Sequence, residues 1–203
     1  MIRPVLMTAD APELAVTTDV ARALASVAAV PLGDEALERD RILIAHLIDG
    51  RDDAADRSAR PGHLTGSAFV VDATATQALL LFHTKLQRWL QPGGHADGDT
   101  NLAAVALREA TEESGIDGLR VWPDPIDLDI HRVAPPREDP HLHLDLRYLV
   151  VAPPGAEPVG NEESQALRWV AEADLSTYDV DAGLLRLARS AFALARRLRS
   201  TAT

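Results

Sequence analysis

The chain of 203 residues contains no cysteine. It therefore has no disulfide framework, no thiolate nucleophile and no thiolate metal site. Hydrophobic residues make up 46% of the chain, yet no apolar run approaches the roughly 20 residues that a membrane-spanning helix needs. Neither a serine nucleophile elbow nor a Walker phosphate loop is present. We expect a soluble globular protein whose chemistry rests on other groups.

Basic residues are in the minority, with 20 Lys and Arg against 31 Asp and Glu, and the formal net charge is -11. This charge opposes nonspecific attraction to nucleic-acid backbones and anionic membranes, so we expect neither as a partner. A small phosphorylated substrate remains compatible, because divalent cations reverse the sign of the field inside one site. The N-terminal residues lack the pattern of a signal peptide, and we expect a cytoplasmic enzyme.

The chain divides into two parts with different sequence patterns. Residues 13–30 are rich in alanine and residues 34–47 place Leu37, Ile42, Ile44 and Leu47 at roughly helical spacing, which predicts two helices. Residues 49–61 are polar and turn-rich and form the best candidate linker. We therefore expect a helical N-terminal extension over residues 1–60 and a catalytic domain over residues 61–203.

The second part of the chain alternates short apolar runs with turns, which is typical of strands. A long helical pattern covers residues 101–114, and another over residues 182–198 ends in arginines, as suits a helix C-terminus. A mixed sheet packed between helices is the predicted α/β fold. The expected strands are residues 66–71, 78–82, 119–122, 126–133, 143–151 and 167–170.

The most informative stretch is PGGHADGDTNLAAVALREATEESGI, residues 92–116. Its first residues, Pro-Gly-Gly, permit a tight loop with the backbone close to a ligand. Asp97, Gly98 and Asp99 predict a turn whose last acid caps the following helix. Gly115 is the expected end of that helix.

Three acids lie on one face of this predicted helix. Glu109, Glu112 and Glu113 have offsets of zero, three and four, so their carboxylates project about one turn apart and repel each other. Mg²⁺ or Mn²⁺ would offset that repulsion, because both prefer oxygen ligands. Arg108 precedes Glu112 by four residues and is expected to orient it. The alternative, a solvated acidic face, is weakened by the apolar residues around the helix, which suggest that it is embedded.

Gly94, five residues, Thr100, seven residues and then residues 108–116, REATEESGI, resemble the Nudix box. The family pattern is G, five residues, E, seven residues, REUXEEXGU, where U is aliphatic. The resemblance implies the family's α/β/α sandwich, here with helices added at both ends. The box's first glutamate is Thr100 in this chain, and Asp99 is a candidate to take that acid's place.

The resemblance also implies a reaction. Glu109, Glu112 and Glu113, with the backbone carbonyl of Gly93 or Gly94, would hold one or more Mg²⁺ or Mn²⁺ ions. Water would then attack a diphosphate phosphorus in a nucleoside diphosphate linked to another moiety, while a carboxylate takes the proton. The expected catalytic residues are Glu112, Glu113, Arg108 and an acid before the last strand, Glu163 or its neighbour Glu162.

Other side chains are candidates for substrate contact. His141, His143, Asp145 and Arg147 alternate with apolar residues and give a strand one polar face; of these, His143 and Arg147, together with His95, are the expected substrate contacts. A zinc site from His141, His143 and His95 is a weaker interpretation, because a histidine pair two residues apart lacks a third fixed ligand. Further candidates that are more typical of core, rim or surface are Trp89, Trp122, Lys85 and Arg88.

Two other functions remain open. A Nudix-like domain that binds a nucleotide as a sensor, without turnover, would be compatible with Thr100. Hydrolysis of nucleoside triphosphates would use the same metal site with a different leaving group. The N-terminal helices would serve equally well as a homodimer interface or as a cover for their own domain.

Overall fold

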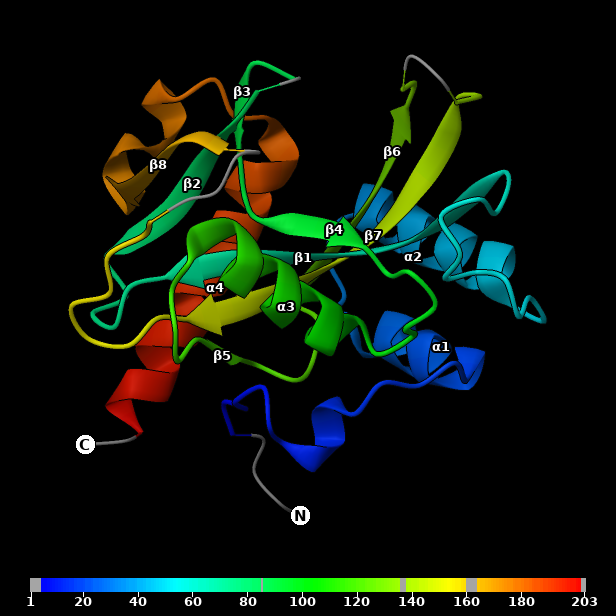
Figure 1. Cartoon of the computed structure of the whole chain (residues 1–203), viewed down its shortest axis with the longest axis horizontal. Helices are drawn as coiled ribbons and strands as arrows, with labels where there is room; N and C mark the ends of the chain where they lie inside the picture. Colours follow the sequence, from blue (N-terminus) through cyan, green and yellow to red (C-terminus); the bar gives the residue numbers. More distant parts are fainter. Residues whose placement is uncertain (1–4, 85, 136–137, 160–163, 202–203) are drawn as a thin grey trace.

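The computed structural model describes residues 5–84, 86–135, 138–159 and 164–201. Figure 1 shows a central sheet with helices on both sides. The helical elements are η1 (Pro12–Leu14), α1 (Val20–Ala29), α2 (Glu35–Ile48), α3 (Leu102–Ser114), η2 (Glu172–Thr177) and α4 (Ala182–Ser200). The strands are β1 (Gly62–Val71), β2 (Gln77–His83), β3 (Arg88–Leu90), β4 (Gly93–His95), β5 (Arg120–Val121), β6 (Asp127–Val133), β7 (His141–Val151) and β8 (Ser164–Ala171).

The sheet is mixed, as expected. Its main path runs β3-β2-β1-β7-β5, while β4 pairs with β1, β6 with β7 and β8 with β2. β1 and β7 pair in parallel from Gly62 beside Leu142 to Val71 beside Val151, and the other pairs are antiparallel. The sequence predicted six of these strands but missed β3 and β4, because three residues are too few to show an alternating pattern.

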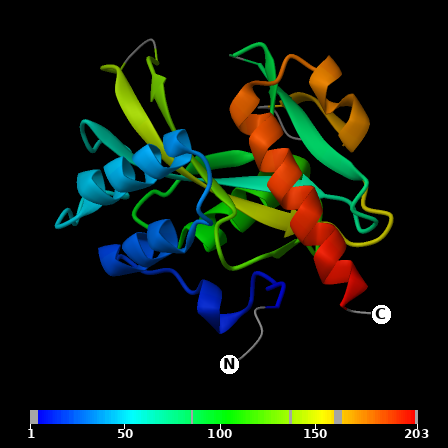
Figure 2. The ribbon, with the colours of Figure 1, turned by 180° about the vertical axis from the view of Figure 1, so that it is seen from behind.

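Two apolar layers hold the sheet between helices, which confirms the predicted α/β sandwich. One layer joins residues such as Leu64, Leu144 and Leu146 to α1, α2 and α3, and the other joins Phe69 and Leu149 to α4. Because neighbouring residues of a strand point to opposite faces, these two sets lie on opposite sides of β1 and β7. Figure 1 shows α3 in front of the sheet, and Figure 2 shows α4 crossing the opposite side.

The N-terminal part departs from its prediction in two places. Residues 15–19 are not helical; α1 begins at Val20, where the Asp19 side chain accepts a hydrogen bond from the Ala21 amide. In α2 the buried positions are Leu37, Ile44 and Ile48, whereas Ile42 is 61% exposed. The burial follows a helical stripe of offsets zero, seven and eleven, and Ile42 falls outside it.

The predicted linker, residues 49–61, is turn-rich but packed. Ala54, Ala55 and Ala59 are buried, and the carbonyl oxygens of Ala54 and Ala55 accept hydrogen bonds from Leu64 and Gly98. The N-terminal helices therefore share a core with the sheet, and the boundary at residue 60 stays a prediction. No helix in the described part of the chain is both long and apolar enough to cross a membrane.

Candidate functional site

Helix α3 carries the three predicted acids. It covers Leu102–Ser114 and ends at Gly115, whose φ of 65° is the left-handed conformation that glycine adopts without strain. Leu102, Val105, Leu107 and Ala110 are buried, so the helix is embedded as predicted. An acid on such a helix lies close to packed backbone, and its environment differs from that of a solvated surface acid.

Two of the three acids, Glu109 and Glu113, are packed against β4. A Cβ atom added to Gly94 would collide with the Glu109 carboxylate, so a larger residue at this position would force that carboxylate to move. The Gly93 amide donates a hydrogen bond of 2.9 Å to Glu113 Oε2. Glu112 is exposed. The structure thus brings Gly94, Glu109 and Glu113 together at the start of β4, with Glu112 on the solvent side of the same helix.

Arg108 was expected to orient Glu112. The contacts found for it are with Glu109 Oε1 and the carbonyl oxygen of His95, both at 3.1 Å. Burial raises the pKa of Glu109, and the charge of Glu112 adds to this, while Arg108 opposes it. Arg108 therefore ties Glu109 to the end of β4 and keeps part of its negative charge balanced.

The donor set fits a divalent cation of the Mg²⁺ or Mn²⁺ class. It consists of carboxylate oxygens whose mutual repulsion a cation would relieve, next to a glycine that lets the backbone approach. Glu162 and Glu163, the candidate acids before the last strand, lie outside the described residues.

The box position that departs from the family pattern anchors the N-terminal segment. The Thr100 hydroxyl donates to the carbonyl oxygens of Thr17 at 3.0 Å and Asp19 at 2.8 Å. Asp99 accepts from the amides of Thr17 and Asn101. The prediction that Asp99 caps α3 is wrong, because the helix begins later and Asn101 is its N-cap residue. The partners at residues 17 and 19 are some 80 positions away, so no local pattern indicated them.

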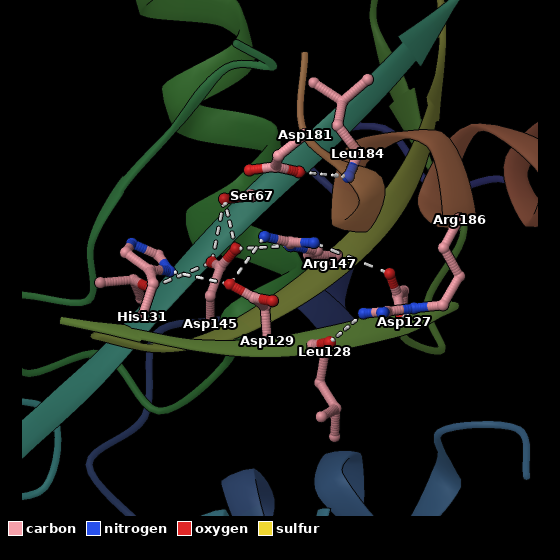
Figure 3. A network of polar contacts seen from close by, with 11 residues as sticks. Ser67, Asp127, Leu128, Asp129, His131, Asp145, Arg147, Asp181, Leu184 and Arg186 are labelled. Atoms are coloured by element: carbon pink, nitrogen blue, oxygen red, sulfur yellow. Dashed lines mark hydrogen bonds and ion pairs between the residues drawn. The ribbon is translucent and has the colours of Figure 1, made fainter. Parts of the chain in front are cut away.

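A network of charges occupies one end of the polar face of β1, β6 and β7 (Figure 3). Arg147 Nε lies 2.9 Å from Asp145 Oδ2, and its terminal nitrogens lie 3.1 Å from Asp129 and 3.7 Å from Asp127. Ser67 donates to Asp145, and Arg186 from α4 donates to Asp127. Burial alone would lower the Arg147 pKa, but the aspartates raise it. Arg147 is 5% exposed and surrounded by acids, so its role in substrate contact stays a prediction.

A cluster of histidines occupies the other end of this face. His63 on β1 lies beside His143 on β7 and two residues before Thr65, which pairs with His95 on β4. The His63 ring centroid lies 5.1 Å from that of His95, 4.9 Å from that of His141 and 5.0 Å from that of His143. We call His63, His95, His141 and His143 the histidine cluster. The sequence had indicated three of them but not His63, whose place depends on the parallel pairing of β1 with β7.

Burial and neighbouring histidines lower the pKa values of His63, His95 and His143, which favours their neutral form. Burial lowers the pKa of His63 to about 4 and that of His143 to about 3, and the other histidines add to both effects. Burial also lowers the pKa of His95. The carbonyl of Ala59 opposes the effect on His63 only in part. Neutral imidazoles can accept a proton or bind a metal through a lone pair.

The aromatic candidates lie elsewhere. Trp89 packs against Phe82 and Tyr178 and beneath Arg168, beside a cavity of about 410 Å³ that Arg88 also lines. Trp122 lines a second cavity, next to α4. The α3 acids line neither cavity in the described structure. Lys85 lies outside the described residues.

Comparisons with known proteins agree with this geometry. The model of the NUDIX domain matches residues 63–189. A NUDIX-family hydrolase from Clostridium perfringens superposes with a TM-score of 0.55 at 25% identity, covering 65% of this chain and 97% of that one.

Two further structures share the fold. The Ap4A hydrolase of C. elegans has a TM-score of 0.54 at 19% identity, covering 66% of this chain and 98% of its own. The dihydroneopterin triphosphate pyrophosphohydrolase of E. coli has a TM-score of 0.50 at 15% identity, covering 66% and 97%. Among the curated proteins, none matches this chain. Since the family model spans more than half of the chain and its box acids sit together on α3, the protein belongs to the Nudix hydrolase family.

Proposed function

We propose that the protein hydrolyses a diphosphate bond in a nucleoside diphosphate linked to another moiety, or in a similar small phosphorylated substrate, with Mg²⁺ or Mn²⁺. The observation that carries the proposal is the packing of the Glu109 carboxylate against Gly94, beside the Glu113 bond to the Gly93 amide. This arrangement gathers oxygen donors next to backbone, where a hard cation is favoured.

Gly94, Glu109, Glu112 and Glu113 would hold the cation. When bound, it would neutralise part of the diphosphate charge and lower the pKa of a nearby water molecule. The negative charge of the chain makes such neutralisation important, because an unscreened carboxylate cluster repels phosphate.

The protein's own side chains would transfer the proton and position the acids. Glu112, on the exposed side of α3, is the proposed general base, which takes a proton from the attacking water. The new bond forms between the water oxygen and phosphorus, and the phosphate-terminated fragment leaves with the electron pair of the broken bond. Glu113 is fixed by the Gly93 amide and Arg108 positions Glu109. Glu163 stays a second candidate for the base.

Substrate contacts are proposed for His95 and His143, which are half-buried and border the same end of the sheet. Arg147 is the third proposed substrate contact. It would influence the substrate through the aspartates that surround it, or contact the substrate directly after these aspartates rearrange. The sign of the net charge favours a small substrate over a nucleic acid.

The test is a panel of sugar nucleotides, dinucleoside polyphosphates, dinucleotide cofactors and nucleoside triphosphates, each assayed with Mg²⁺, with Mn²⁺ and with EDTA. We expect metal-dependent release of phosphorylated products from at least one diphosphate compound. Glu112→Gln should lower kcat by about 10²–10⁴-fold, the usual contribution of a general base. Glu157→Gln, a change at an exposed acid outside α3, is the matched control and should retain activity.

Product analysis separates the alternatives. Inorganic pyrophosphate released from a nucleoside triphosphate would assign the triphosphate reaction. Tight binding of a nucleotide with no turnover on any compound would contradict hydrolysis and support a sensor.

A further inference from the structure

Five of the chain's seven histidines gather at one end of the polar sheet face, although they come from four different strands. They are the histidine cluster and His131, whose ring centroid lies 5.2 Å from that of His143. His131 is held by Asp129, with Nδ1 3.0 Å from Oδ2. The box acids of α3 do not account for this gathering, because they bind through oxygen and lie on another element.

The geometry points to a second metal site, a zinc-class transition-metal site formed by His63, His95 and His143. One ring nitrogen from each of the three lies within 4.8 Å of the other two. In a tetrahedral zinc site with Zn–N distances of 2.0–2.1 Å, ligand nitrogens are about 3.4 Å apart. Side-chain rotations that shift these nitrogens by about 1 Å would therefore close the site around an ion.

His63 gives an independent reason for a ligand here. Its side chain is fully buried on β1, and neither ring nitrogen makes a hydrogen bond of ordinary geometry with a described residue. Burying a polar group without a partner is unfavourable. A metal ion bound to one of its nitrogens would supply that partner.

The choice of metal follows from the donors. Three neutral imidazole nitrogens suit Zn²⁺, Co²⁺, Ni²⁺ or Cu²⁺ better than Mg²⁺, which prefers oxygen. His141 lies beside this site: its ring centroid is 4.9 Å from that of His63 and 5.5 Å from that of His143, and its Nδ1 lies 2.8 Å from the Asp139 carbonyl oxygen.

The site adjoins the box acids of α3 but does not include them; His95 is the one ligand that lies within the box. His95 follows Gly94, which packs on Glu109, and Arg108 holds the His95 carbonyl oxygen. Three protein ligands leave at least one coordination position open, where water or an anionic oxygen of a bound ligand can bind. Because His95 and His143 are half-buried, this position is reachable from solvent. The site does not depend on the proposed hydrolysis.

The experiment uses the full chain, stripped with EDTA and dialysed, then titrated with ZnCl₂ by calorimetry and with CoCl₂ by visible absorption. We expect one zinc ion per chain and a cobalt spectrum typical of nitrogen ligands. His63→Gln and His95→Gln should each weaken zinc binding by at least about tenfold, since even residues behind a metal's ligands contribute that much. His95→Gln keeps the test valid if the fully buried His63 position does not tolerate change.

Two controls identify the site. His46→Gln alters an exposed histidine on α2 and should bind zinc like the wild type. Glu112→Gln alters the box and should also leave zinc binding in place. Absence of zinc binding, equal affinity in the cluster variants and the wild type, or a loss confined to Glu112→Gln would each overturn the proposal.

Discussion

The two ends of the polar sheet face share β1 and β7, but their buried polar groups have different kinds of partner. At one end, Arg147 is surrounded by Asp127, Asp129 and Asp145, and opposite charges balance each other. At the other end, the neighbours of His63 are other histidines, and neither of its ring nitrogens makes a hydrogen bond of ordinary geometry with a described residue. His143 and Asp145 are only two positions apart on β7, with Leu144 between them.

The difference indicates which end is balanced in charge by its own residues: Arg147 Nη1 and Asp127 Oδ2 make no hydrogen bond within the described structure, but they form an ion pair at 3.7 Å. A buried charge is tolerated when opposite charges and hydrogen bonds surround it, and removing one member leaves the others uncompensated. A buried neutral ring without partners contributes little to folding, so its presence is better explained by something that binds to it. The aspartate–arginine end therefore supports the fold, and the histidine end is the place to search for a ligand.

The largest expected effect comes from breaking the aspartate–arginine end. Arg147→Met should lower the free energy of unfolding by about 3–5 kcal/mol, because it leaves buried aspartates without their cation. Urea denaturation followed by circular dichroism measures this loss. Arg132→Met, at an exposed position on β6, is the matched control. A loss below about 1 kcal/mol in Arg147→Met would mean that Arg186 alone balances the acids.

A medium effect is expected above the same network, at the start of α4. The Asp181 side chain accepts a hydrogen bond of 2.8 Å from the Leu184 amide, and the neighbouring Gly183 lies against the Arg147 guanidinium. Asp181→Ala should lower the free energy of unfolding by about 1 kcal/mol, as the loss of an N-cap usually does. Asp181→Asn keeps the acceptor and should remain close to the wild type. Equal losses in both variants would assign the effect to charge and not to capping.

The smallest effect is expected at the histidine end. In EDTA, His63→Leu should lower the free energy of unfolding by less than about 1 kcal/mol, or should raise it. The reason is that an apolar side chain of similar size replaces a buried polar group that has no partner of ordinary geometry. Thermal melting with and without zinc completes the comparison. The wild type should melt at a higher temperature with zinc and the variant should not. A loss above about 2 kcal/mol in EDTA would show that His63 has partners in solution, and the contrast between the two ends would disappear.

Local patterns carried the sequence predictions that the structure confirms. The embedded helix α3 and its three acids follow from spacing within 13 residues, and α4 follows from a long amphipathic run. The mixed sheet could be predicted from apolar runs and turns.

Contacts between segments that are distant in the sequence could not be predicted from such local patterns. His63 joins the histidine cluster through strand pairing with β7, and Thr100 finds its partners at residues 17 and 19. The exposed Ile42 shows the same limit within one helix, because the side of α2 that faces the core depends on where the helix packs. The acids of the site were therefore predictable, while the residues that surround and support them were not.

The bonds from Thr100 also restrict how this box can be exchanged with that of a relative. A box taken from a protein with glutamate at this position would place a longer, charged side chain where a buried hydroxyl now holds two backbone carbonyls. The transplanted motif would therefore displace the segment before α1, even though that segment contains no box residue. In this protein the box and the segment before α1 are joined by these hydrogen bonds, and chimeras should exchange the two together.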